Sequence, residues 1–291
     1  LGLAATSARA GAGGMQPLPD EALSEVRGAD GIAFNLSKFS LTSIPTNPLS
    51  IVYTSPNGSS LTLSGLDLSR TDDADTFADP YSLGIVQRSG LPDVIALDFP
   101  LNAAGGQRWS LTADFSNCDG VTAGTCTGTD FVGGTLQVAG LTMRGGGLYI
   151  APSAVATTQG IAFGLGTQLD IDSLAIYSHG RTANDVPDTS DSMILSGIHL
   201  ADAATGGAWM LADVTKHPGL INAETDATGS YLHLQVGWPT TADPVPAASF
   251  RIDNVTFTTP GAGGTPVTTN LGAASIASMQ LNYVDIKFRT N

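Results

Sequence analysis

The sequence predicts an all-β protein, with an antiparallel β-sandwich or jelly-roll-like body built from bulged strands. Charged residues make up only 13% of the 291 residues, and glycine occurs 35 times. Threonine, serine, alanine and asparagine fill the spaces between apolar positions, a mixture typical of short strands and many turns. The third observation is an eight-residue apolar pattern that recurs along the chain.

The recurring unit reads apolar, x, apolar, x, x, apolar, x, apolar. Composition alone predicts fewer than about one such unit in a chain of this length. The sequence contains seven, at residues 34–41, 61–68, 136–143, 169–176, 193–200, 250–257 and 279–286. The unit therefore predicts a strand at each of these places.

The two spacer residues in the middle of the unit interrupt the regular alternation of side chains between the two faces of a strand. In a regular strand the two apolar pairs would face opposite sides of the sheet. A β-bulge returns both pairs to one face, and residues that tolerate a positive φ suit it. The second spacer is such a residue in four units: Gly65, Gly140, Gly197 and Asn254. The alternative is a corner at each spacer, as in a β-solenoid, but solenoid coils need a nearly constant period and these units are irregularly spaced.

Simpler alternating strands are expected at 95–99, 109–115 and 231–236, and together with the repeated units they would complete two sheets. The glycine run 145–147 lies between strand-like segments, and we interpret it as a turn. Residues 32–291 are expected to form a single β domain.

Two short segments precede this domain. Residues 1–14, LGLAATSARAGAGG, end like a signal peptide and are either its remnant or an extension that docks. An ordered extension would contact its own domain, or would add a strand to a neighbouring subunit through Leu1, Leu3 and Ala5. Residues 15–31 predict a short helix that Asp20 caps and Gly28 ends, followed by a turn.

The stretch PLPDEALSEVRGADGI at residues 17–32 resembles the start of pilus-system surface proteins of Gram-negative bacteria. The resemblance covers about 30 residues at the N-terminal end. In that family the stretch follows the signal peptide directly and leads into glycine-rich β structure, whereas here residues 1–14 precede it. The resemblance implies a secreted protein, extracellular or at the cell surface of a Gram-negative bacterium.

Charge excludes several classes of partner. The formal net charge is −14 and the 12 basic residues are scattered, so no cationic stripe could neutralise a nucleic acid backbone. No apolar run reaches the roughly 18 residues that a membrane-spanning helix needs. We expect neither nucleic acid binding nor a membrane span.

The two cysteines, Cys118 and Cys126, are separated by the turn-like sequence DGVTAGT. They are expected to form a disulfide across this loop, although two unrelated reduced thiols are an alternative. A loop of this size would contribute roughly 2.5 kcal/mol in the chain-entropy model. Such a bond favours an oxidising compartment.

The sequence contains no recognisable catalytic motif, so we expect no enzymatic activity and no catalytic residues. The histidines are isolated and predict no transition-metal site; the polar phase of the strands predicts that His199 and His233 are exposed. The segment TDDADTFADP is the best candidate for a ligand, because oxygen-rich loops suit calcium. Its carboxylates are Asp72, Asp73, Asp75 and Asp79, and a solvated acidic loop is the alternative.

Three tryptophans could line a sugar-binding face. Trp109 alternates in phase with Leu111 and Phe115, which favours the core, whereas Trp238 precedes Pro239 and is expected to be exposed.

These observations favour a structural subunit of a secreted extracellular filament, a homopolymer joined by N-terminal strand addition. The alternative is a monomeric secreted carbohydrate-binding adhesin or lectin-like module, with calcium in the acidic loops. In either case a host or matrix surface is a candidate partner.

Overall fold

The computed structural model describes residues 31–44, 49–55, 58–72, 79–102, 107–122, 125–128, 130–154, 159–179, 181, 186–238 and 244–289. The extension at residues 1–14, and all but Gly31 of the segment 15–31 with its expected helix, lie outside this part of the chain.

The described chain is almost entirely β-structure. The strands are β1 (Ile32–Phe34), β2 (Ser40–Leu41), β3 (Ile51–Thr54), β4 (Ser60–Arg70), β5 (Tyr81–Val86), β6 (Val94–Asp98), β7 (Trp109–Cys118), β8 (Val121–Thr122), β9 (Thr125–Cys126), β10 (Asp130–Pro152), β11 (Ile161–Tyr177), β12 (Ser192–Asp202), β13 (Trp209–Ala212), β14 (Gly219–Asp226), β15 (Gly229–Gly237), β16 (Ala247–Pro260), β17 (Pro266–Gln280) and β18 (Tyr283–Arg289). One short 3-10 helix, η1 (Ala262–Gly264), lies in the turn between β16 and β17.

Sixteen of these strands form one sheet, whose main path runs β1-β5-β6-β10-β11-β12-β16-β17. The sheet branches at its two longest strands, because the two ends of each pair with different partners. β10 pairs with β7 toward its start and with β6 toward its end. β11 pairs with β13 and β14 toward its start and with β12 toward its end.

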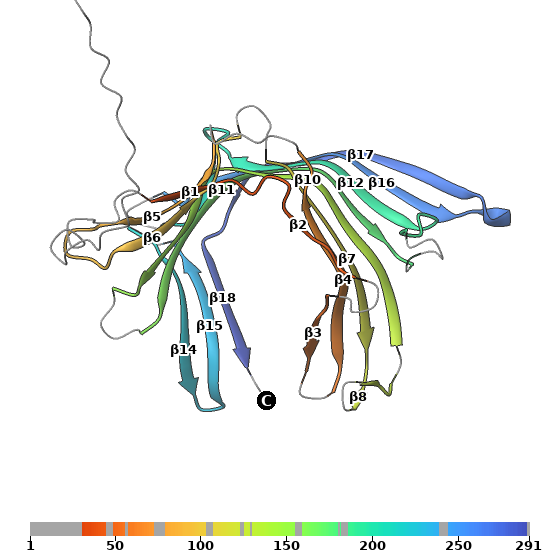
Figure 1. Ribbon diagram of the computed structural model, residues 1–291, viewed down its shortest axis with the longest axis horizontal. Coiled ribbons are helices and arrows are strands. Elements are labelled where there is room, and N and C mark those ends of the chain that lie inside the picture. Colours follow the sequence, from red (N-terminus) through yellow and green to blue (C-terminus); the bar gives the residue numbers. More distant parts are fainter. Residues whose placement is uncertain are drawn as a thin grey trace, which may run out of the picture.

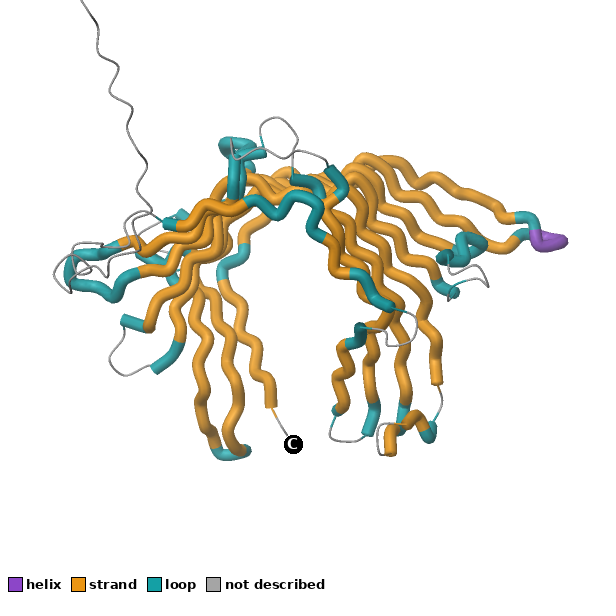
Figure 2. Tube along the Cα trace, in the orientation of Figure 1, coloured by secondary structure: helices purple, strands orange, loops and turns teal. Residues whose placement is uncertain are grey.

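The branched sheet bends into an arch (Figure 1). One leg consists of β14, β15 and β18, and the other contains β3, β4 and β7; the β16–β17 hairpin extends to one side (Figures 1 and 2). This confirms the predicted all-β, antiparallel fold with bulged strands. Its sandwich-like shape comes from one bent sheet in place of two separate sheets. The strand pairs are antiparallel, and the coils of the alternative β-solenoid are not formed by the described residues.

Five of the repeated units each lie within one long strand: β4, β10, β11, β12 and β16. The other two units break at their spacers. The unit 34–41 divides between β1 and β2, and the unit 279–286 divides between β17 and β18. Bulges and corners, the two alternatives for the spacer, therefore both occur.

The bulge prediction is confirmed at the glycine spacers. Gly65, Gly140 and Gly197 have φ values of 58°, 66° and 62°. The fourth spacer, Asn254, lies at a register shift between β16 and β17, so the bulge is present there without a positive φ. Glycine adopts a positive φ without the steric cost that a Cβ brings, which explains the glycine at three of the four positions.

Each of these three glycines also faces an aspartate on the adjacent strand. A Cβ added to Gly65 would lie 2.9 Å from Oδ2 of Asp114, and one added to Gly197 would overlap the Asp253 carboxylate. Gly140 has the same relation to Asp172. At Gly140 and Gly197 the carboxylate occupies the space that a side chain would fill, so glycine is required there for packing as well as for its backbone conformation.

The glycine run 145–147 was predicted to be a turn, and this prediction is wrong. Gly145 and Gly146 have positive φ values of 59° and 66°, but they form a bulge inside β10, where the register with β11 shifts between Arg144 and Gly147. Because β10 has partners on both sides of the run, the ladder continues through it instead of reversing.

The buried core is small and lies where strands cross. One cluster contains Phe163, Ala212, Val236 and Trp238, near the junction of β11 with the β14–β15–β18 leg. A second group is aromatic: Tyr81 stacks on Phe34, and its hydroxyl accepts a hydrogen bond of 3.2 Å from Nε1 of the buried Trp109. The prediction that Trp109 belongs to the core is confirmed.

We expect Gly197→Ala to destabilise the protein more than Gly206→Ala. Both glycines have a positive φ, which costs an alanine roughly 1–2 kcal/mol, but a Cβ on Gly206 meets nothing within 4 Å. The Asp253 carboxylate should add about 1–2 kcal/mol to the cost at Gly197. Urea unfolding followed by circular dichroism measures the difference, and equal losses would contradict the role of the carboxylate.

Candidate functional site

The most unusual surface is the edge strand β17. It ends the main path of the sheet, and among the described strands it pairs with β16 alone. Every one of its 15 residues except Met279 is exposed, and its sequence PVTTNLGAASIASMQ contains no charged residue. The side chains of Val267, Leu271 and Ile276 are 53%, 63% and 49% exposed. On its other side no described strand pairs with it, so this edge combines open backbone groups with exposed apolar side chains.

The other edges of the sheet are protected. β18 carries Asp285 and Lys287, while the remaining edges are short: β1 has three residues, β2 two, and β3 and β13 four each. Short edges and charged side chains are the usual means by which proteins prevent a sheet edge from pairing with another chain. β17 uses neither, which makes it the candidate site for strand addition.

A second surface is the apolar face of the long strands. The repeated units of β10, β11, β12 and β16 lie in register and form four cross-strand rows. Most of these side chains are only half-buried, because the sheet here is a single layer. The rows, which define the apolar face, are Leu136–Ile176–Met193–Phe257, Val138–Leu174–Leu195–Val255, Ile171–Ile198–Ile252 and Met143–Leu169–Leu200–Phe250.

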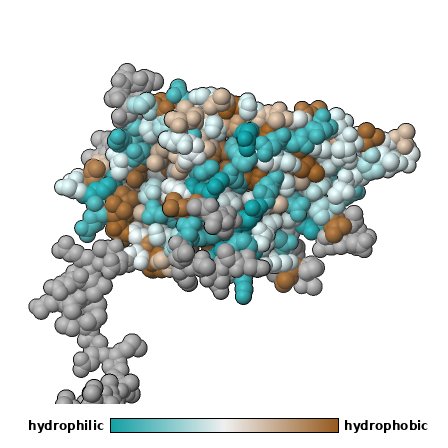
Figure 3. Space-filling model, turned by 90° about the horizontal axis from the view of Figure 1, so that it is seen from above, coloured by the Kyte–Doolittle hydropathy of each residue, from teal (hydrophilic) through white to brown (hydrophobic). Residues whose placement is uncertain are grey.

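Charged side chains occupy the opposite face of the same strands. His199 Nδ1 lies 2.6 Å from Oδ1 of Asp170, and its Nε2 lies 3.5 Å from Oδ2 of Asp253. Arg144 pairs with Asp170, and Arg251 Nε lies 3.0 Å from Oδ1 of Asp253. Figure 3, which looks down on the arch, shows hydrophilic side chains gathered in a band across the sheet. His199 is partly exposed, as predicted, and its ring nitrogens lie beside the carboxylates of Asp170 and Asp253.

His233 was also predicted to be exposed, and this is wrong. Its side chain is 8% exposed, with Nε2 2.9 Å from Oδ1 of Asp285 and Nδ1 3.1 Å from Oδ1 of Asn222. The hydroxyl of Tyr231 donates to Oε2 of Glu224 at 2.7 Å. Hydrogen bonds from the Asn222 amide and the Tyr231 hydroxyl lower the pKa of Glu224. This network connects β14 and β15 to β18, whose one partner within the described sheet is β15.

Only part of the acidic loop lies within the described residues. Asp73 and Asp75 lie outside the described residues. Asp72 accepts hydrogen bonds from the buried Arg70 guanidinium, at 2.7 Å from Nη2, and from the backbone N–H of Arg108. Asp79 accepts from the backbone N–H groups of Leu101 and Asn102. No group of three or more metal-ligating side chains gathers in the described part of the chain, and calcium binding stays a prediction.

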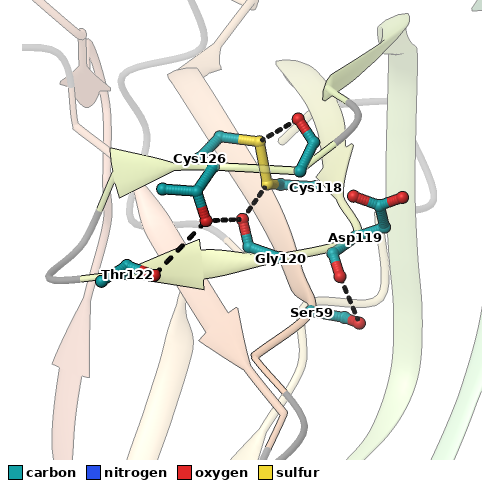
Figure 4. The surroundings of a disulfide bond; sticks show 8 residues. Ser59, Cys118, Asp119, Gly120, Thr122 and Cys126 are labelled. Carbon is teal, nitrogen blue, oxygen red and sulfur yellow. Dashed lines mark hydrogen bonds between the residues drawn. A yellow bond between two sulfur atoms is a disulfide. The ribbon is translucent and has the colours of Figure 1, made fainter.

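The disulfide prediction is confirmed. Cys118 and Cys126 are bonded, with their Cα atoms 5.9 Å apart. The bond lies at the tip of one leg and closes the loop that contains the small β8–β9 hairpin (Figure 4). The expected contact residues Leu1, Leu3 and Ala5 lie outside the described residues.

The tryptophans form no exposed sugar-binding face. Trp238 was expected to be exposed, but it is 8% exposed, and its Nε1 donates to the carbonyl of Leu211 at 2.9 Å. The ring of His217 lies 4.8 Å from it. Trp209 Nε1 donates to the carbonyl of Pro246. The sequence misled here because Trp238 packs in the core cluster against residues of other strands, which its own neighbours in the chain do not reveal.

Comparison with models of known protein families, with curated proteins and with solved structures finds no match. Among the described residues, no helix combines the length and the apolar character needed to cross a membrane.

We expect Asp72→Asn to lower the free energy of unfolding by about 3–5 kcal/mol, because it removes the carboxylate that pairs with the buried Arg70 guanidinium. The matched control is Asp172→Asn. Asp172 pairs with Arg108, but their side chains are 59% and 38% exposed, so the loss should stay below about 1 kcal/mol.

Both variants should be melted with calcium and with EDTA. A structural Asp72 gives the same loss in both conditions. A loss seen only with calcium would instead identify Asp72 as a calcium ligand.

Proposed function

We propose that this protein is a non-catalytic structural subunit of a secreted extracellular filament, and that copies join by strand addition at β17. The observation that carries the proposal is the long, uncharged, exposed edge. In strand addition, the main-chain hydrogen bonds supply affinity and alternate side chains supply specificity. An edge with these properties would otherwise promote aggregation, so its retention suggests a use.

Residues 1–14 of a neighbouring copy suit the role of donor. Extended, these 14 residues would reach about 46 Å, enough to run along most of the roughly 50 Å of β17. The segment contains Arg9 and no acidic residue, so it brings no negative charge to a partner whose net charge is −14. Leu1, Leu3 and Ala5 alternate, which would place them together on one face of an added strand.

The remaining features agree with a structural role outside the cell. The disulfide suits an oxidising compartment, as does the resemblance of residues 17–32 to pilus-system surface proteins. The described charged clusters act within the sheet, where they pair across strands or fasten β18. We therefore assign the protein no catalytic residue.

Deletion of residues 1–14 should leave a folded monomer that no longer assembles. The β body keeps every strand of the sheet, whereas the donor is lost. Electron microscopy and light scattering measure assembly, and circular dichroism checks the fold. Fibres formed by the truncated chain would refute the donor role of this segment.

Leu271→Lys should weaken assembly while leaving the monomer folded, because a charge on the acceptor edge must be desolvated when a strand is added. Leu101→Lys is the matched control: Leu101 is 69% exposed, similar to the 63% of Leu271, and lies outside β17. Equal assembly of the two variants would place the acceptor elsewhere on the molecule.

A further inference from the structure

A shallow hollow of about 480 Å³ lies at the tip of the β3–β4–β7 leg, beside the disulfide. It is far in sequence from β17 and does not depend on the assembly proposed above. Its lining combines one aromatic ring, several hydroxyl groups and an amide; the main lining residues are Tyr53, Ser55, Ser59, Leu61, Asn117 and Asp119.

Three of these side chains form one cross-strand row. Tyr53 pairs directly with Leu61, and Leu61 pairs directly with Asn117. Directly opposed residues of antiparallel strands point to the same face of the sheet, with their Cβ atoms about 5 Å apart. Tyr53 is 65% exposed and Leu61 is 43% exposed, and Asn117 is exposed as well. An aromatic ring, an aliphatic side chain and an amide are thus presented to solvent side by side.

The surroundings of this row are held by covalent and hydrogen bonds. The Cys118–Cys126 disulfide fixes the residue next to Asn117. The backbone N–H of Ser55 donates to the carbonyl of Ser59 at 2.7 Å, which closes the β3–β4 turn. The Ser59 hydroxyl donates to the carbonyl of Asp119 at 3.4 Å and links that turn to β7 (Figure 4). Because the frame is fixed before a ligand arrives, binding would lose little conformational entropy.

We propose that this hollow binds a neutral saccharide. A sugar ring has an apolar face of C–H groups, which stacks on an aromatic ring, and hydroxyls that need both donors and acceptors. Tyr53 offers the ring, and the amide of Asn117 offers a donor and an acceptor in one group. The net charge of −14 and the nearby Asp119 disfavour acidic sugars.

The full chain should be screened on an array of neutral oligosaccharides, including glucans, mannans, galactans and chitin fragments, with sialylated and uronic acid glycans alongside. We expect binding to at least one neutral glycan. A blank array, or binding to acidic glycans alone, would overturn the proposal.

Substitutions then locate the site by titration calorimetry with the glycan found. Tyr53→Ala and Asn117→Ala should each weaken affinity roughly tenfold or more, because each removes one of the two recognition elements. Tyr53→Phe keeps the ring and should stay within about threefold. The matched control is Tyr283→Ala, since Tyr283 is 57% exposed on the other leg. An unchanged affinity in Tyr53→Ala, or an equal loss in Tyr283→Ala, would refute the location.

The hollow lies outside β17, so these variants should assemble like the unaltered chain. Light scattering on each sample shows whether the variant still assembles. It therefore distinguishes a weakened glycan site from weaker apparent binding by particles that contain fewer copies. The saccharide proposal and the filament proposal can therefore fail independently.

Discussion

The bend of the long strands depends on glycines with positive φ, each of which leaves room for a carboxylate from the next strand. In the centre of the sheet, Gly140 of β10 faces Asp172 of β11, and Gly197 of β12 faces Asp253 of β16. In four neighbouring strands the alternation of side chains between the two faces shifts at the same position along the sheet; these strands are β10, β11, β12 and β16. Their pairing therefore shows no register shift at these contacts. If one strand lacked the change, half of its side chains would turn to the wrong face.

Each of these carboxylates is also balanced by an arginine. Asp114 pairs with Arg181 at 2.8 Å, Asp253 pairs with Arg251 at 3.0 Å, and Asp172 pairs with Arg108. Ion pairs as exposed as those of Asp172 and Asp253 contribute little to stability, about 1 kcal/mol or less. Their main effect is to hold the carboxylate over the glycine, which keeps the bend in one position and gathers the apolar side chains on one face.

A bent sheet of this kind has consequences for function. In the arch, single-layer regions leave the apolar face half-buried, and one side of the last strand, β17, has no partner among the described strands. At the tip of one leg, the same single layer exposes an aromatic, an aliphatic and an amide side chain next to a disulfide; these are Tyr53, Leu61 and Asn117. Both candidate surfaces therefore follow from a sheet that has no second layer to cover it.

The sequence by itself determined the β class, the bulges at Gly65, Gly140 and Gly197, and the Cys118–Cys126 bond, because each depends on residues close together in the chain. It could not determine that β17 is an edge, since strand order depends on contacts between distant segments. Nor could it find the burial of His233, whose cover comes from Asn222 and Asp285 on other strands. Only the tertiary structure decided which polar groups are buried and which apolar ones are exposed, because a strand's own alternation does not say what packs against either face.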